Sequence, residues 1–453
     1  MSKFVKLKKG FDIKLAGKAE KQIAGVERPD TYAVKPTDFQ GILRPKVLVR
    51  EGDTVKAGTP VLIDGKNDKI KHTAPVSGEV VAVKRGDKRK LLEIVILADK
   101  EIEYVQFPTY TISDIVNLKT EDCLEPMIAS GVWPNIIQRP YGIIADPAAH
   151  PKSIFISAFD TNPLAPDLDF LIKDQDKYFE AGIAVLRKFS PSIHLNVDAN
   201  SEVSGLLSQT KDIQINKFSG PHPAGNVGVQ IHHIDPIRKG DIVWTVSPFG
   251  VVQIGKLFLE GKYDASRLVA LTGSEVKTPQ YYKTYTGGSI KKIIENNLKS
   301  DHLRYVSGNV LTGKRIGKED HTGFYDNQVT VIPEGDYHEF FGWILPSTKK
   351  LSFHRAFGLL SFMMPKKDYV VDTNTHGEDR AFVQTGVFER VIPMDVLPMY
   401  LIKAIMAEDF DAMEALGIYE VIEEDLALCE FVDVSKHDIQ AILRDGLNLM
   451  QYS

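Results

Sequence analysis

The feature that most constrains the fold is a repeat near the N-terminus. Residues 47–53, VLVREGD, recur at residues 81–87 as VAVKRGD, so both copies share the pattern V-x-V-[KR]-x-G-D. Each copy is typical of a short strand that ends in a Gly-Asp turn, where glycine supplies a positive φ. Two such halves related by a pseudo-two-fold axis predict a flattened β-sandwich of the lipoyl and biotinyl carrier type, a barrel-sandwich hybrid, over residues 1–104.

Carrier domains of this type present a modified lysine at the tip of a hairpin. Asp68-Lys69 lies in a predicted polar hairpin, but Ala74 follows Lys69 too closely to match the arm that a carrier hairpin uses. We therefore interpret this segment as a solvated hairpin. A carrier domain modified at Lys69 stays as an alternative, which an intact mass equal to the sequence mass would remove.

From about residue 105 the pattern changes to strands that alternate with helical stretches. Continuous apolar runs of strand length, separated by helical crossovers, indicate a parallel sheet covered on both faces. We predict a Rossmann-like α/β domain over residues 105–262. The expected strands are residues 153–159, 193–197 and 213–218, followed by an extended segment at 227–234, and the expected helices are 166–189, a short one after 197, and 241–259 ending at Gly261.

The last third of the chain divides into two further patterns. Four short apolar segments around one helix predict a β-grasp domain over residues 263–335, with the helix at 289–297 capped by Ser289. From Met394 onward leucine and isoleucine recur at helical spacing with acidic residues between them. This pattern predicts a mostly helical, acidic C-terminal domain over residues 336–453.

A Rossmann-like domain raises the question of a dinucleotide. The fingerprint needs Gly-x-Gly-x-x-Gly between a strand and a helix, so that bare amides approach a pyrophosphate. No such triplet occurs in residues 105–260, and residues 131–134, GVWP, carry bulky side chains and a proline. Residues 218–225 contain glycine but also two prolines, which lack N–H donors. The sequence therefore argues against nucleotide binding.

Cysteine and histidine give no sign of a metal or redox centre. The chain has two cysteines, Cys123 and Cys429, which exclude a disulfide framework and a four-thiolate site. His232 and His233 are adjacent, and on an extended segment they would point to opposite faces and could not share one ion. No nucleophile turn and no Walker-type loop occurs, so we expect no self-contained catalytic site.

Charge and hydropathy restrict the partners. Residues 1–100 carry 17 Lys and 5 Arg against 8 Asp and 5 Glu, a net charge of +9, whereas residues 380–453 carry a net charge of −9. The basic residues are dispersed among acids, which argues against nucleic acid and favours a protein partner or anionic lipid headgroups. We expect no transmembrane segment and no signal peptide, and hence a cytoplasmic chain.

Two apolar features are candidates for contacts outside the core. Residues 353–365, FHRAFGLLSFMMP, have basic flanks; a core helix is the first interpretation and docking on a partner or membrane the second. The other feature is Trp133 followed by Arg139 and Tyr141. An indole beside a guanidinium can sandwich a quinone-like ring and donate hydrogen bonds to it.

These residues carry a resemblance to one family, the A subunit of the Na⁺-translocating NADH:quinone reductase of bacteria. The similar stretches run the length of the chain. They are residues 85–89, 130–133 with 138–140, 159–165, 218–225, 254–258, 327–329, 341–343, 388–391 and 423–429. A more distant similarity is to the flavin-bearing subunit of respiratory complex I, whose Gly-rich loop and cysteine clusters this chain lacks. The family often has a second cysteine four residues after Cys429, where this chain has Asp433.

The resemblance implies a peripheral subunit on the cytoplasmic face of the bacterial inner membrane, without catalytic residues, covalent cofactor or metal of its own. It implies partners among the membrane-embedded and peripheral subunits of the same complex, and a contribution to the binding of quinone, ubiquinone or menaquinone. Chemistry and family region together select Phe39, Trp133, Arg139 and Tyr141 as the quinone-binding residues. The alternatives are a cofactor-free assembly scaffold and a flavin- or NADH-binding dehydrogenase subunit.

Overall fold

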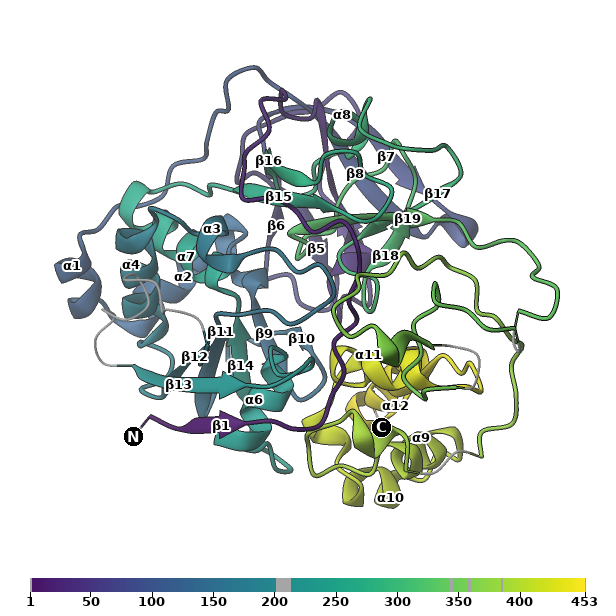
Figure 1. Ribbon diagram of the computed structural model, residues 1–453. Coiled ribbons are helices and arrows are strands. Elements are labelled where there is room, and N and C mark those ends of the chain that lie inside the picture. The colour runs from purple at the N-terminus through teal and green to yellow at the C-terminus, as the bar shows by residue number, and fades with distance from the viewer. Residues whose placement is uncertain (1, 201–212, 343–344, 357–359, 384–385, 453) are drawn as a thin grey trace.

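The computed structural model describes residues 2–200, 213–342, 345–356, 360–383 and 386–452. Figure 1 shows its layers: a sandwich of strands packs above a large mixed sheet, and helices of the C-terminal part lie beside that sheet. The predicted short helix after residue 197 falls outside the described residues. No helix of the described residues is long and apolar enough to cross a bilayer.

The N-terminal sandwich has two antiparallel sheets with the strand orders β2-β8-β7-β4 and β3-β5-β6. Its core contains fully buried Tyr32, Leu62, Val80 and Ile94 between the sheets. Gly52 has φ +90° as the repeat predicts, but Gly86 has φ −98°, and Lys88 and Arg89 take the positive φ of the second turn. The strands are β2 (Thr31–Val34), β3 (Pro45–Val47), β4 (Thr54–Val55), β5 (Pro60–Asp64), β6 (His72–Thr73), β7 (Gly78–Arg85) and β8 (Leu91–Ala98).

A seven-stranded sheet follows, with the order β1-β13-β12-β11-β14-β9-β10. The strands β1, β13, β12, β11 and β14 run parallel to one another. Strand β9 runs antiparallel to β14, and β10 runs antiparallel to β9. The sequence locates β11, β12 and β13 to within two residues, whereas it does not predict β1, β9, β10 or β14. The strands are β1 (Phe4–Lys6), β9 (Ile136–Arg139), β10 (Ile143–Ile144), β11 (Ser153–Ser157), β12 (Ile193–Asp198), β13 (Gln214–Ser219) and β14 (Val243–Val246).

Helices cover both faces of this sheet. α4 and α7 pack together over one face in one core with Ile154 and Ile156, whereas α6 covers the opposite face above Phe155. Three expectations are wrong here: residues 227–234 form helix α6, residues 241–259 contain strand β14 before α7, and the helix expected at 166–189 is split into α3 and α4. The helices are α1 (Ile112–Asn117), α2 (Thr120–Ser130), α3 (Leu168–Leu171), α4 (Asp176–Leu186), α6 (Val227–Ile234) and α7 (Pro248–Glu260), with a short 3-10 helix at Trp133–Asn135.

The third unit is a five-stranded sheet with the order β16-β15-β19-β17-β18 and one short helix. Its helix is shorter than predicted, and its N-cap is Ile290 rather than Ser289. Strand β18 has no counterpart in the sequence prediction. The elements are β15 (Ser266–Thr272), β16 (Gln280–Tyr285), α8 (Lys291–Ile294), β17 (Leu303–Ser307), β18 (Lys314–Ile316) and β19 (Gln328–Pro333).

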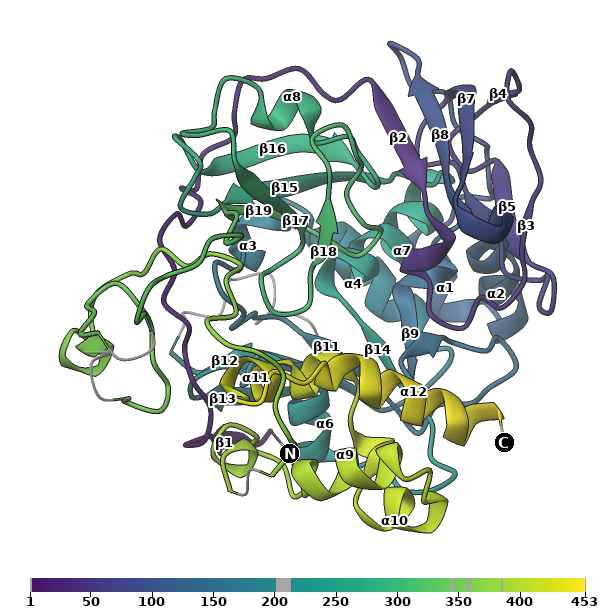
Figure 2. The ribbon, with the colours of Figure 1, turned by 90° about the vertical axis from the view of Figure 1, so that its right-hand side faces the viewer.

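The C-terminal part begins with a long irregular segment and ends in helices packed on the seven-stranded sheet (Figure 2). Its core joins Leu401, Leu426 and Leu443 to Phe218 and Val229 of the α/β unit. A core helix at residues 353–365 is wrong for the described residues, which form turns and a short 3-10 helix at Leu360–Met363. The helices are α9 (Pro398–Met406), α10 (Phe410–Ala415), a 3-10 turn at Ile418–Glu420, α11 (Glu423–Val432) and α12 (Ile439–Tyr452).

A buried ionic contact fastens the sandwich to the third unit. Glu93 of β8 lies 3.2 Å from Nδ1 of His321, whose Nε2 lies 3.1 Å from the hydroxyl of Thr31, and Lys84 Nζ lies 2.5 Å from Glu93. Burial alone would raise the pKa of Glu93, but hydrogen bonds with His321 and Lys84 outweigh it and lower the pKa to about 2. The ionised carboxylate is therefore the form that stabilises this junction.

We expect Glu93→Gln to lower the free energy of unfolding by roughly 2–3 kcal/mol near pH 7. A folded-state pKa below the unfolded-state value gives stability that is present above about pH 4.5 and lost as the pH falls through 2. The difference between wild type and variant should therefore shrink below about pH 4.5 in urea titrations. Glu79→Gln, an exposed glutamate of β7, is the control, and an equal effect of both substitutions at pH 7 would contradict the assignment.

Candidate functional site

Trp133 lies in the core of the α/β unit. Its side chain is 0% exposed, and its indole Nε1 donates to the carbonyl of Ala145 at 2.7 Å. The ring meets Trp244 edge to face at 5.5 Å between centroids and Phe189 at 5.7 Å. This packing leaves no face of the indole open to a ligand in this conformation.

Arg139 is the last residue of strand β9 and is 1% exposed. Its Nη1 lies 2.6 Å from Asp425 Oδ2 and its Nη2 lies 2.5 Å from Glu424 Oε1, so both amino groups contact the first turn of α11. Asp425 is 0% exposed and also accepts a hydrogen bond from the backbone N–H of Ile422. Arg139 thus ties the seven-stranded sheet to the C-terminal helices, and this contact joins residues 286 positions apart in the sequence.

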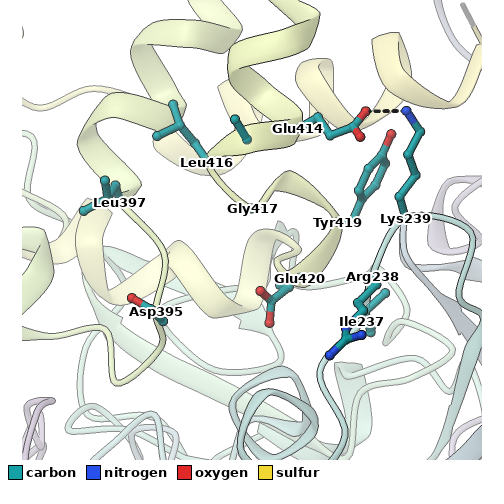
Figure 3. A pocket seen from close by; sticks show the side chains of 11 residues that line it. Ile237, Arg238, Lys239, Asp395, Leu397, Glu414, Leu416, Gly417, Tyr419 and Glu420 are labelled. Carbon is teal, nitrogen blue, oxygen red and sulfur yellow. Dashed lines mark hydrogen bonds and ion pairs between the residues drawn. The ribbon is translucent and has the colours of Figure 1, made fainter.

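Tyr141 lies in the turn between β9 and β10 and is half-buried with φ +80°. Its carbonyl accepts a hydrogen bond from Nη1 of Arg444 at 2.8 Å, and its ring meets Tyr419 edge to face at 6.3 Å between centroids. Tyr419 in turn lines a cleft of about 390 Å³ between the α/β unit and the C-terminal helices (Figure 3).

The walls of this cleft are mainly charged. Lys239 Nζ lies 2.8 Å from Glu414 across it, and His232 Nδ1 lies 2.7 Å from Glu420. His232 Nε2 accepts from the backbone N–H of Asp395, so both ring nitrogens are occupied. His232 and His233 lie on helix α6 rather than on an extended segment, and among the described residues no group of His, Cys, Asp and Glu could hold a metal ion. The cleft suits charged groups better than an apolar ring.

Phe39 lies in a different place, at the junction of the sandwich with the α/β and third units. Its ring centroid lies 4.2 Å from that of His72, 4.9 Å from Phe324 and 6.2 Å from Tyr325. The hydroxyl of Tyr325 donates to the carbonyl of Pro134 at 2.7 Å. Phe39, His72 and Phe324 line a cavity of about 10 Å³, enough for one water molecule. Aromatic rings of the sandwich and the third unit therefore meet here against the Pro134 loop of the α/β unit.

His72 is the polar group of this junction. It is 3% exposed, and its Nδ1 has no hydrogen-bond partner among the described residues. Burial lowers the pKa of His72 to about 4, so the imidazole is neutral near pH 7 and offers one donor and one acceptor. Sequence reasoning missed His72, because a histidine at the end of a polar hairpin carries no signal of burial.

The loop at residues 131–134, whose sequence argues against nucleotide binding, forms one wall of the junction. Gly131 and Pro134 both line the cavity, and Gly131 has φ +95°. A Cβ at Gly131 would lie 2.0 Å from the hydroxyl of Thr73, which donates to the carbonyl of Ser130. Glycine is therefore required for the close approach of this loop to the sandwich, and the structure brings Phe39 and the Trp133 loop to one site while the Trp133 side chain points away.

A buried network of side chains links β13, β12 and helix α6 to Ser157, which lies at the carboxyl end of β11, and open α/β sheets bind nucleotides at the carboxyl ends of their strands. Asn216 donates to Asn196 at 2.9 Å, Asn196 donates to Gln230 at 2.8 Å, and Gln230 donates to Ser157 at 2.8 Å. The three amide side chains are 0% exposed. The network satisfies its own polar groups and leaves no row of free donors for a pyrophosphate.

Neither cysteine is placed for redox chemistry. Cys123 lies in the core of the α/β unit and Cys429 in that of the C-terminal helices, and both are 0% exposed. Burial raises the pKa of Cys123 to about 11 and that of Cys429 well above the value of a free thiol. Both groups are therefore neutral thiols of low reactivity.

Three family models match successive parts of the chain. Residues 5–99 match the NqrA N-terminal barrel-sandwich hybrid domain, residues 118–263 the NqrA second alpha/beta domain, and residues 268–318 the NQRA C-terminal domain. These models together cover more than half of the chain.

Whole-chain relatives agree with the family models. The A subunit of the Na⁺-translocating NADH-quinone reductase of Alcanivorax borkumensis is 37% identical over 450 residues, and that of Neisseria meningitidis serogroup B is 36% identical over 449 residues. Each alignment covers 99% of both chains. A solved NAD⁺-reducing NiFe-hydrogenase aligns at 11% identity and a TM-score of 0.38 over 77% of this chain and 66% of its own, which is too low to carry an argument. The chain belongs to the family of Na⁺-translocating NADH-quinone reductase A subunits.

Proposed function

We propose that this subunit is peripheral, lies on the cytoplasmic face of the bacterial inner membrane, and contributes to quinone binding and to assembly. In the complex, electrons pass from NADH to quinone while Na⁺ is moved, and the partners are the membrane-embedded and peripheral subunits. The names of the full-length relatives support the reaction. The second unit is Rossmann-like, the third resembles a β-grasp domain, and the last is mostly helical.

The quinone contact that the geometry supports best is the junction around Phe39. The observation that carries it is the buried imidazole of His72, whose Nδ1 lacks a partner and whose ring lies against Phe39. Aromatic faces pack on a quinone ring, and a neutral imidazole N–H donates to a quinone carbonyl.

A quinone ring needs more room than the closed cavity of about 10 Å³ provides. Phe39 forms the outer wall, on a turn that ends a short 3-10 helix at Pro36–Asp38 and passes Gly41 at φ +91°. Displacement of this turn opens the cavity toward His72. Ubiquinone or menaquinone enters in this way, and a neighbouring subunit completes the outer wall.

The other three predicted residues support this site rather than touch the ring. Trp133 anchors the loop whose Pro134 carbonyl meets Tyr325, and Arg139 and Tyr141 hold the following hairpin against the C-terminal helices. The rival function, a flavin- or NADH-binding dehydrogenase subunit, is disfavoured by the buried amide network, whose N–H donors bond to one another's side chains and to Ser157.

We expect Phe39→Ala to weaken the binding of a water-soluble short-chain ubiquinone to the full chain by about tenfold, because it removes one aromatic face of the site. Quenching of tryptophan emission reports the titration. His72→Phe keeps the aromatic ring but removes the hydrogen bond, and should also weaken binding.

Leu43→Ala is the matched control, since Leu43 is exposed on the same segment and does not line the cavity. Thermal unfolding checks that each variant is folded. Equal quinone affinity in Phe39→Ala, His72→Phe and Leu43→Ala would overturn the junction as the site, and undetectable binding by the chain and by the reconstituted complex would favour the scaffold function.

A further inference from the structure

The irregular segment between β19 and α9 contains an apolar surface that the quinone proposal does not use. We call residues 339–342, 345–356 and 360–369 the lobe; it projects from the body of the molecule on the left of Figure 2. Its described residues lack α-helix and strand, and hydrogen bonds within the lobe hold it together, such as Leu360 N–H to the Ser347 carbonyl and Ser352 N–H to the Ser361 hydroxyl.

One side of the lobe is pinned to the body. Tyr369 is 3% exposed and exchanges backbone hydrogen bonds with the N-terminal segment at Lys14 and Ala16. The ring of Phe353 meets Phe11 edge to face at 5.3 Å, and His354 Nε2 lies 2.8 Å from the carbonyl of Val432. These contacts fix which side of the lobe faces outward.

The outward side carries large apolar side chains. Phe340 is 83% exposed, Met363 66% and Phe362 46%, and the rings of Phe340 and Phe341 contact each other in a tilted arrangement with 4.3 Å between centroids. Exposing several such side chains together in one small region is costly in water and marks an interaction surface.

The same stretch of chain is rich in basic residues. Residues 339–369 contain four Lys and one Arg against one Glu and one Asp. Lys349 and Lys366 are exposed, and neither ammonium group has a carboxylate partner among the described residues. Apolar tips fringed by free lysines match the interface of an anionic bilayer, where the tips enter the headgroup layer and the lysines meet phosphate.

We propose that the lobe is a membrane-surface anchor that inserts Phe340, Phe362 and Met363 into the headgroup layer of anionic lipid. An irregular backbone favours this occupant over a protein helix or strand, because it offers neither a regular groove nor a free strand edge. The anchor would orient the protein on the membrane independently of its contacts with other subunits, and it does not depend on the quinone site.

The test uses the full chain and vesicles of phosphatidylcholine with or without about one-third phosphatidylglycerol. We expect cosedimentation with the anionic vesicles, weakened in high salt because the lysine contribution is screened. Phe362→Ser with Met363→Ser should lower the partition coefficient at least tenfold. Lys349→Glu with Lys366→Glu should lower binding to anionic vesicles and leave the weak binding to neutral ones unchanged.

Leu397→Ser is the control, because Leu397 is half exposed outside the lobe, and it should bind as wild type does. Absence of vesicle binding by the wild-type chain, or equal binding by the Phe362→Ser, Met363→Ser variant, would overturn the proposal. If that variant instead failed to join the complex while the wild-type chain ignored vesicles, the lobe would be assigned to a protein partner.

Discussion

Arg139→Met should lower the free energy of unfolding by about 3–5 kcal/mol, because it leaves the fully buried Asp425 carboxylate without its counter-charge. The loss arises between the seven-stranded sheet and α11, so the C-terminal helices should separate from the α/β unit first. Denaturant titrations followed by circular dichroism measure the total, and limited proteolysis identifies the segment that opens.

A second substitution separates the buried charge from the lost packing. Arg139→Met combined with Asp425→Asn removes both members of the pair and should regain part of the stability. Lys239→Met is the control, since its ion pair with Glu414 is exposed and should contribute no measurable stability. If Arg139→Met had the stability of wild type but no longer bound quinone, the structural role of Arg139 would be contradicted. Arg139 would then again be a candidate for direct contact with quinone.

Gly255→Ala should cost about 3 kcal/mol by forcing α7 away from α4. A Cβ at Gly255 would lie 1.8 Å from the carbonyl oxygen of Tyr178 and 3.0 Å from the backbone nitrogen of Gly182. Gly182 is equally constrained, because its Cβ would lie 2.1 Å from the carbonyl oxygen of Val251. Backbone cannot yield as a flexible side chain does, so both helices must move apart.

Thermal unfolding compares Gly255→Ala with Gly25→Ala, whose Cβ would meet nothing within 4 Å. Gly25→Ala should be neutral or slightly stabilising, because it only restricts the unfolded chain. If the two variants unfolded at the same temperature, the closeness of α4 and α7 would not limit stability.

The sequence predicts correctly those helices and strands whose local hydrophobic pattern agrees with the packing around them in the folded structure. Strand β11 contains the apolar run Ile154–Ile156, which is typical of a parallel strand buried on both faces, whereas β12 and β13 alternate apolar with polar residues. Residues 227–234 contain β-branched residues and predict an extended segment, but form α6, because the position above β11 requires a helix. Tertiary context overrides a weak local preference there.

The site was less predictable for a related reason. Phe39 and Trp133 were selected by their chemistry together with the family resemblance, and the structure brings Phe39 and the loop of Trp133 to one junction. The burial of Trp133 and the pairing of Arg139 with Asp425 depend on packing between residues far apart in sequence, which no local pattern records. Three units together form the surroundings of His72, in which its Nδ1 has no hydrogen-bond partner among the described residues.

Strand β1 has a consequence for synthesis. It pairs in parallel with β13, where Phe4 lies opposite Lys217, so its partner leaves the ribosome more than 200 residues later. At roughly 5–20 residues per second, the edge of the seven-stranded sheet stays incomplete for about 10–40 s. The sandwich strands lie between those two segments in the chain and form their two sheets with one another, so they have time to fold first. The nascent N-terminal segment therefore spends that interval unpaired, and a chaperone or another protein of the complex that binds it would set the time at which the sheet closes.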